Sequence, residues 1–138
     1  MERCVFVRIA GREYPMSFSL GATKKIIGKF GDAKNMMSDL KKEGDDFKKL
    51  DTISSILEIL IAQGCAYKNY FEKDLPKPEN APVENGKWVP ITKEEIDIAI
   101  QINDTEEIVE RISECITKGS RKTVEAITTG KNAKATQG

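Results

Sequence analysis

The stretch RCVFVRIAGREYPMSFSLGATKKIIGKFG, residues 3–31, decides the topology of this chain. Cys4–Ile9 is rich in β-branched and aromatic residues, which favour a strand, and turn formers follow it directly. Tyr14–Phe18 is expected to return as the second strand of a hairpin over about residues 3–18. Pro15 restricts that strand to a sheet edge or a strand start, because proline has no N–H to donate to a ladder.

Two short helices are expected after the hairpin. Ser19 is a suitable N-cap and Gly31 a suitable stop for a helix over 19–31. The next segment, 32–43, has a thin apolar stripe made of Met36, Met37 and Leu40, so it is expected to lie on the surface of the core.

The strongest periodicity indicates a central helix over about 46–72, with Asp45 or Asp51 as candidates for its cap. Its apolar positions follow the i, i+3, i+4, i+7 spacing of one helix face. They are Ile53, Ile56, Leu57, Leu60, Ile61 and Gly64. Burial of such side chains contributes about 1.5–3 kcal/mol each before entropy is subtracted.

A proline-rich stretch, 74–91, separates this helix from the last ones and is expected to be an extended loop, because proline removes donors and restrains its neighbour. Within it, 84–87 reads as a turn, and Lys87–Ile91 is a candidate for a short strand. Thr92 and Glu95 form a capping-box pattern that predicts a helix over 92–102. Another helix is expected over 104–118, and the small polar residues of 130–138 predict a disordered tail.

These elements predict an α+β fold: an N-terminal two-stranded hairpin followed by a mostly helical body, in one domain over 1–129. A two-stranded hairpin alone is marginal in water, so it needs the central helix or a neighbouring subunit behind it.

The composition is that of an ordinary soluble protein, with 39% hydrophobic and 32% charged residues in 138. No run approaches the roughly 20 apolar residues of a membrane span, and the first residues do not resemble a signal peptide. The three cysteines, Cys4, Cys65 and Cys115, lack metal-type spacing and fit reduced thiols in a cytoplasm.

The net charge is zero, but the charges are unevenly distributed. Residues 91–117 hold 2 Lys/Arg against 8 Asp/Glu, whereas 118–138 hold 5 against 1. Such a chain can attract charged partners locally, including another copy of itself, although solvated faces are the favoured explanation of the pattern.

No pattern of catalytic residues is found, so no enzymatic activity and no cofactor or metal are expected. Histidine, the commonest general base and zinc ligand, does not occur in the sequence. Gly21 and Gly28 are too far apart for a phosphate loop, and Phe30 stands where a magnesium-binding hydroxyl is required. Nucleic acid is an unfavoured partner, since a strongly basic face is the usual signature and this chain is neutral.

The remaining candidates for function are apolar residues that could contact a partner protein. Methionine adapts to varied partners, and aromatic residues dominate interface hot spots. The candidate partner-binding residues are Met36, Met37, Leu40, Tyr67, Tyr70, Phe71 and Trp88. The alternative for the aromatic residues is that they pack the proline-rich loop onto the helices.

Four blocks of the sequence resemble the tail assembly chaperones of phages and prophages of Gram-positive, clostridial-type bacteria. They are IAGREYPMSFSLGATKKIIGKFGD at 9–32, LEILIAQGCAYKNYFEKDLP at 57–76, GKWVPITKEEI at 86–96 and KNAKATQG at 131–138. The resemblance implies a mostly helical, non-enzymatic protein of the host cytoplasm. It also implies that the chain binds the tape measure protein and the tail tube protein during assembly.

Weak self-association is a further expectation. Two alternatives stay open: a structural tail component that is retained in the particle, and a small nucleic-acid-binding module.

Overall fold

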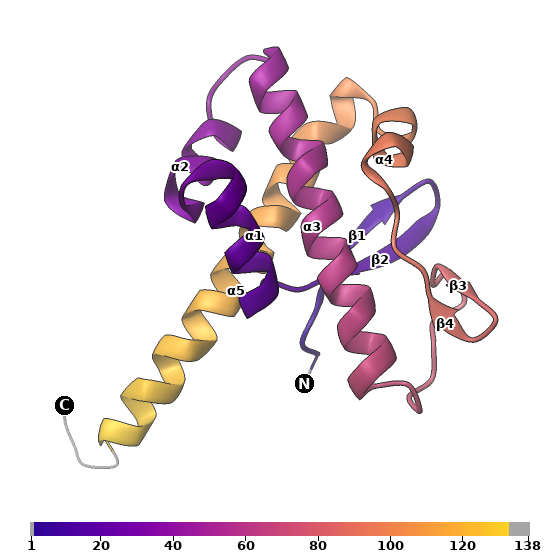
Figure 1. The fold of residues 1–138 in the computed structure, drawn as a ribbon, viewed down its shortest axis with the longest axis vertical. Coiled ribbons are helices and arrows are strands. Elements are labelled where there is room, and N and C mark those ends of the chain that lie inside the picture. The colour runs from indigo at the N-terminus through magenta and orange to yellow at the C-terminus, as the bar shows by residue number, and fades with distance from the viewer. Residues whose placement is uncertain (1, 133–138) are drawn as a thin grey trace.

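The computed structural model describes residues 2–132, with side chains to residue 120, and it has the expected α+β architecture (Figure 1). Strands β1 (Val5–Ile9) and β2 (Arg12–Met16) form an antiparallel hairpin. Ala10 and Gly11 adopt positive φ angles of 52° and 80° between them, as a tight two-residue turn requires. Pro15 lies in β2, which is an edge strand as predicted, because the sheet has two strands.

The first three helices are α1 (Leu20–Phe30), α2 (Ala33–Leu40) and α3 (Phe47–Phe71). Ser19 caps α1 as expected, because its Oγ accepts from the N–H of Ala22 at 3.0 Å. The cap of α3 is Asp46, which accepts from the N–H of Lys49, and neither Asp45 nor Asp51 has this role. Asp51 lies inside the helix and pairs with Lys93 at 2.8 Å. Helix α2 ends at Leu40, three residues before its expected end.

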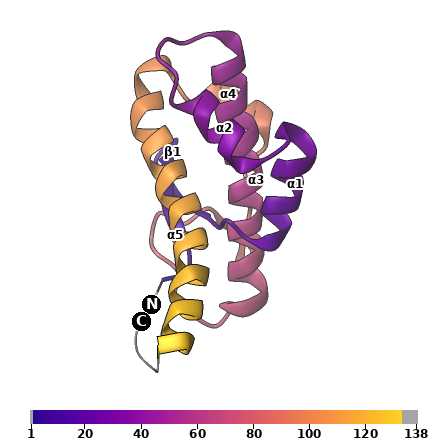
Figure 2. The same cartoon turned by 90° about the vertical axis from the view of Figure 1, so that its left-hand side faces the viewer.

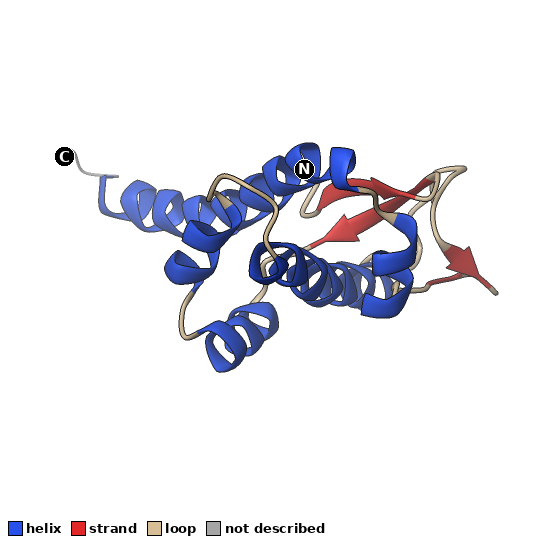
Figure 3. Cartoon of the chain, turned by 90° about the horizontal axis from the view of Figure 1, so that it is seen from above, coloured by secondary structure: helices blue, strands red, loops and turns tan. Residues whose placement is uncertain are grey.

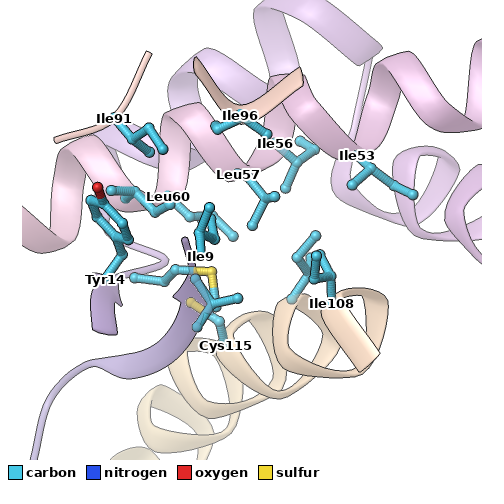
Figure 4. Close-up of a cluster of buried hydrophobic side chains, with 14 of the residues drawn as sticks. Ile9, Tyr14, Ile53, Ile56, Leu57, Leu60, Ile91, Ile96, Ile108 and Cys115 are labelled. Carbon is cyan, nitrogen blue, oxygen red and sulfur yellow. The ribbon is translucent and has the colours of Figure 1, made fainter. Parts of the chain in front are cut away.

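Helix α3 is the centre of the fold, and its middle is enclosed on all sides. Every residue from 52 to 57 is buried, because β2, α1, α2, α4 and α5 all pack against α3. Figure 4 shows Ile53, Ile56, Leu57 and Leu60 of α3 meeting side chains from both the hairpin and α5.

Strand β2 approaches α3 so closely that only glycine fits at the contact. A Cβ on Gly64 would lie 2.1 Å from the carbonyl oxygen of Pro15. Next to this contact, the N–H of Ser17 donates to the carbonyl of Leu60 at 3.1 Å. Gly64 therefore belongs to the apolar stripe because it lets two backbones meet.

The proline-rich stretch contains a second small hairpin, β3 (Val83–Glu84) with β4 (Lys87–Trp88). The expected turn at 84–87 is confirmed, with positive φ at Asn85 and Gly86. The strand ends at Trp88 and not at 91, and its partner, Val83–Glu84, was expected to be loop. An Asn-Gly turn favours pairing of the residues on either side of it, which explains this partner.

Two short helices connect the small hairpin to the last long one. Helix α4 (Lys93–Ala99) starts at the predicted capping box but ends three residues early, and the 3₁₀-helix η1 (Ile102–Asp104) follows. The carboxylate of Asp104 accepts from the N–H of Gln101 at 2.9 Å, so it caps η1. Helix α5 begins at Thr105, close to the predicted position.

Helix α5 runs from Thr105 to Asn132, past its expected end at 118 and into the expected tail (Figure 2). Gly119 is a packing position and not a helix stop, because a Cβ there would lie 3.0 Å from Cβ of Phe18. Residues 130–132 are helical, and 133–138 of the predicted tail lie outside the described residues. Seen from above, the β1–β2 hairpin lies between α3 and α5 (Figure 3).

Candidate partner-binding surface

The last turns of α3 carry a group of exposed aromatic side chains. Tyr67, Tyr70 and Phe71 follow the i, i+3, i+4 spacing of one helix face. The ring centroids of Tyr67 and Phe71 are 5.2 Å apart, and those of Tyr70 and Phe71 are 6.4 Å apart. Tyr70 is 77% exposed and Phe71 73%, whereas Tyr67 is half-buried. We call these three residues the aromatic end of α3.

Two further residues, which were not among the predicted partner-binding residues, lie next to these three. The guanidinium of Arg3 lies 4.5 Å above the ring of Tyr67, a cation–π arrangement. Leu75, just after α3, is 55% exposed. The sequence signal for Leu75 is a single leucine between the end of the central helix and the first proline. Tyr70 and Phe71 together offer on the order of 300 Å² of mostly apolar surface, which is the lower end of the range for the largest apolar patch on a monomer, a patch that often has a function.

The opposite face of the same helical turns is fixed to the small β3–β4 hairpin. The side-chain amide of Asn69 donates to the carbonyl of Trp88 and accepts from the N–H of Trp88, both at 2.9 Å. Trp88 is 4% exposed, and its ring packs 6.4 Å from that of Phe6. Asn69 thus pairs with the backbone N–H and C=O of Trp88, as a neighbouring strand would. These hydrogen bonds make the end of α3 a rigid support.

Lys68 lies on this fixed face with its side chain almost fully buried. Its Nζ is 2.9 Å from a carboxylate oxygen of Glu2 and 2.8 Å from one of Glu72. It also lies 5.4 Å from the ring centre of Phe6 and 5.8 Å from that of Trp88. Burial opposes the charge on Lys68, but the hydrogen bonds that Lys68 donates to Glu72 and Glu2 outweigh this effect and raise the pKa of Lys68.

Three of the predicted partner-binding residues are not available to a partner. Met36, Leu40 and Trp88 are 0%, 1% and 4% exposed, and Met37 is half-buried. The reason for the methionine stripe is that α2 packs against both α1 and α3, so the body covers its single apolar face. For Trp88, the alternative reading of loop packing is correct. The structure therefore narrows the candidate site to the aromatic end of α3.

The three cysteines are buried and free. Burial raises the pKa of the Cys4 thiol to about 11 and those of Cys65 and Cys115 to about 12, so the thiols are protonated at neutral pH. Within residues 2–132, no group of three potential ligands is arranged to hold a metal ion. In the same range, no helix combines the length and apolar character that crossing a membrane demands.

Comparisons of the chain with protein-family models, with curated proteins and with solved structures found no match.

Proposed function

We propose that this protein is a phage tail assembly chaperone that binds the tape measure protein and the tail tube protein in the host cytoplasm, without catalysing a reaction. Two independent observations support the proposal. The first is the resemblance of four sequence blocks, in order along the chain, to that family. The second is the aromatic end of α3.

The aromatic end carries the proposal because it combines exposure with a rigid support. Large aromatic side chains lose apolar contact with water when a partner covers them, and they lose little side-chain entropy. Asn69 and Lys68 hold the helix that presents them, so binding costs little backbone ordering. The surface is small, which suits a contact that forms during assembly and is later released.

The experiment is a pull-down from cells that co-express the full chain with the tape measure and tail tube proteins of the same phage or prophage. Tyr70→Ser/Phe71→Ser should lose most of the recovered partner. The control is Leu20→Ser/Ile27→Ser, which removes apolar side chains of 74% and 52% exposure from α1. Equal recovery by both variants contradicts the assignment of the site, and no recovery of either partner by the wild type contradicts the function.

Purified tails separate the chaperone from a retained structural component. A chaperone is absent from mature particles, whereas a structural component is recovered from them in fixed proportion to the tail tube protein.

A further inference from the structure

A second apolar surface lies at the other end of α3, where α3, α4 and η1 meet. It is a hollow of about 310 Å³. Most of its lining is aliphatic, namely Leu50, Ile53, Ile96, Ile100 and Ile102, with Thr105 at one side. Ile102 is 55% exposed. Phe47, one turn before Leu50, is 81% exposed and extends the apolar wall along α3.

A larger hollow of about 700 Å³ shares Ile102 and Thr105 with the first, so the two adjoin. It continues along the first turns of α5, past Val109 and Glu110. We call the two adjoining hollows together the α5 groove. A groove whose first hollow is mostly aliphatic and whose second is mostly charged and polar suits an amphipathic helix.

The α4–α5 side of this groove is acidic. Asp97 lines the first hollow, and Glu106 and Glu110 line the second. In the part of the chain with described side chains, none of these three carboxylates takes part in an ion pair. The opposite side holds Lys41, Lys42 and Lys49 beside Glu43 and Asp45, so the two hollows together are lined by five carboxylates against three lysines. The groove therefore favours a basic occupant.

The chain carries a segment of that chemistry at its own end. Residues 118–138 hold five Lys/Arg against one Glu, and they include Val124 and Ile127 at a spacing of three. Helix α5 carries the first part of this segment away from the body (Figures 1 and 2). Arg121 lies about 24 Å along the helix from Thr105 at 1.5 Å per residue. A continuous α5 thus keeps residues 118–132 out of their own groove, and the groove of another copy is accessible.

We propose that the basic end of α5 of one copy docks in the acidic α5 groove of a second copy. The two surfaces differ, so the contact is heterologous: each copy uses its groove for one neighbour and its α5 end for another. Association of this kind extends head to tail and does not stop at a dimer. The inference rests on the groove and the charge pattern and does not depend on the proposed function.

The test uses two full-length charge-reversal variants in sedimentation velocity. The groove variant is Asp97→Lys/Glu106→Lys, and the end variant is Arg121→Glu/Lys122→Glu. The mean mass of the wild type should rise with concentration, and each variant alone should need about tenfold more protein for the same rise. A mixture of the two variants should associate like the wild type. The acidic end of the end variant then meets the basic groove of the groove variant, so the charges are again complementary.

The matched control is Lys24→Glu/Lys25→Glu, the same reversal on two exposed lysines of α1, which should associate like the wild type. Raising the salt from about 50 mM to about 500 mM should weaken wild-type association, because the charges are screened over a shorter distance. Circular dichroism confirms that each variant is folded. A wild type that stays monomeric, variants that associate unchanged, or a mixture no better than its parts overturns the proposal.

Discussion

The middle of α3 and its last two turns have similar apolar content, but they have opposite roles. Ile56 and Leu60 are 0% exposed and meet neighbours on every side, whereas Phe71 on the same helix is 73% exposed. The middle lies under β2, α4 and α5, and the end extends beyond them and is attached on its Lys68–Asn69 side. Apolar side chains therefore define a core only where other elements cover them, and uncovered ones are candidates for binding.

The largest effect expected from this comparison comes from placing the same charge at both positions. Ile56→Asp should unfold the protein, because an unpaired carboxylate in the core costs more than the whole stability of a small domain. Phe71→Asp should stay folded, with a change within about 0.5 kcal/mol. Thermal melts by circular dichroism measure both variants. A folded Ile56→Asp, or an unfolded Phe71→Asp, would break the distinction.

One turn beyond Leu60, Gly64 tests how tightly the covered part is packed. Gly64→Ala should destabilise by about 3 kcal/mol, because the new Cβ meets the backbone of Pro15 and not a side chain that can move. The matched control is Gly28→Ala in α1, where a Cβ meets nothing within 4 Å. That variant should gain up to about 1 kcal/mol from helix propensity. Urea denaturation gives both values, and a neutral Gly64→Ala would mean that β2 lies further from α3.

Lys68 marks the boundary between the two parts, and its ion pairs predict a pH dependence. The pKa of Lys68 is raised from its ordinary 10.5. Its contribution to the free energy of unfolding is therefore present below that value and is lost as the pH rises through the folded-state pKa. For Glu2, burial opposes ionisation, but the hydrogen bond from Lys68 lowers the pKa below 4.5. Its contribution is therefore present above 4.5 and is lost as the pH falls through the lower folded-state value.

Glu2→Gln isolates the acidic side of this dependence. It should cost at most about 1 kcal/mol at neutral pH, because the Glu2 side chain is 45% exposed. The difference from the wild type should disappear in acid, where Glu2 is protonated in both states. Glu84→Gln, an exposed change away from Lys68, is the control and should show no difference at either pH. A stability difference between Glu2→Gln and the wild type that persists in acid would show that the charge of Glu2 is not its cause.

The last prediction concerns the Cys65 thiol. Its burial has the smallest effect on stability but a clear effect on the rate of alkylation. With its pKa raised from 9.0 to about 12, its thiolate fraction at pH 8 falls about 1000-fold, so alkylation of the folded protein should be very slow. Mass spectrometry with and without denaturant measures this. The free energy of unfolding should fall above pH 9, because the thiols of the unfolded chain lose their protons at a lower pH than those of the folded protein. Labelling of Cys65 in the folded protein as fast as in the unfolded one would place it outside the covered part of α3.

Local signals in the sequence predicted most of the secondary structure. The Asn85-Gly86 turn, the Ser19 cap and the capping box of Thr92 and Glu95 all act within a few residues, so they can be recognised without a tertiary model. The last helix was expected to end at 118, whereas α5 continues to Asn132 and contains Gly119. Its contact is with Phe18, about a hundred residues earlier.

The sequence by itself determined the α+β class, the order of the elements and the apolar stripe of α3, because hydrophobic periodicity and caps are properties of short segments. Only the tertiary structure decided which apolar residues are covered. Met36 and Phe71 were equal candidates for binding, and α1 and α3 bury the first while nothing in the described part covers the second. Burial is set by contacts between segments that are distant along the chain, and these contacts exist only once the chain has folded.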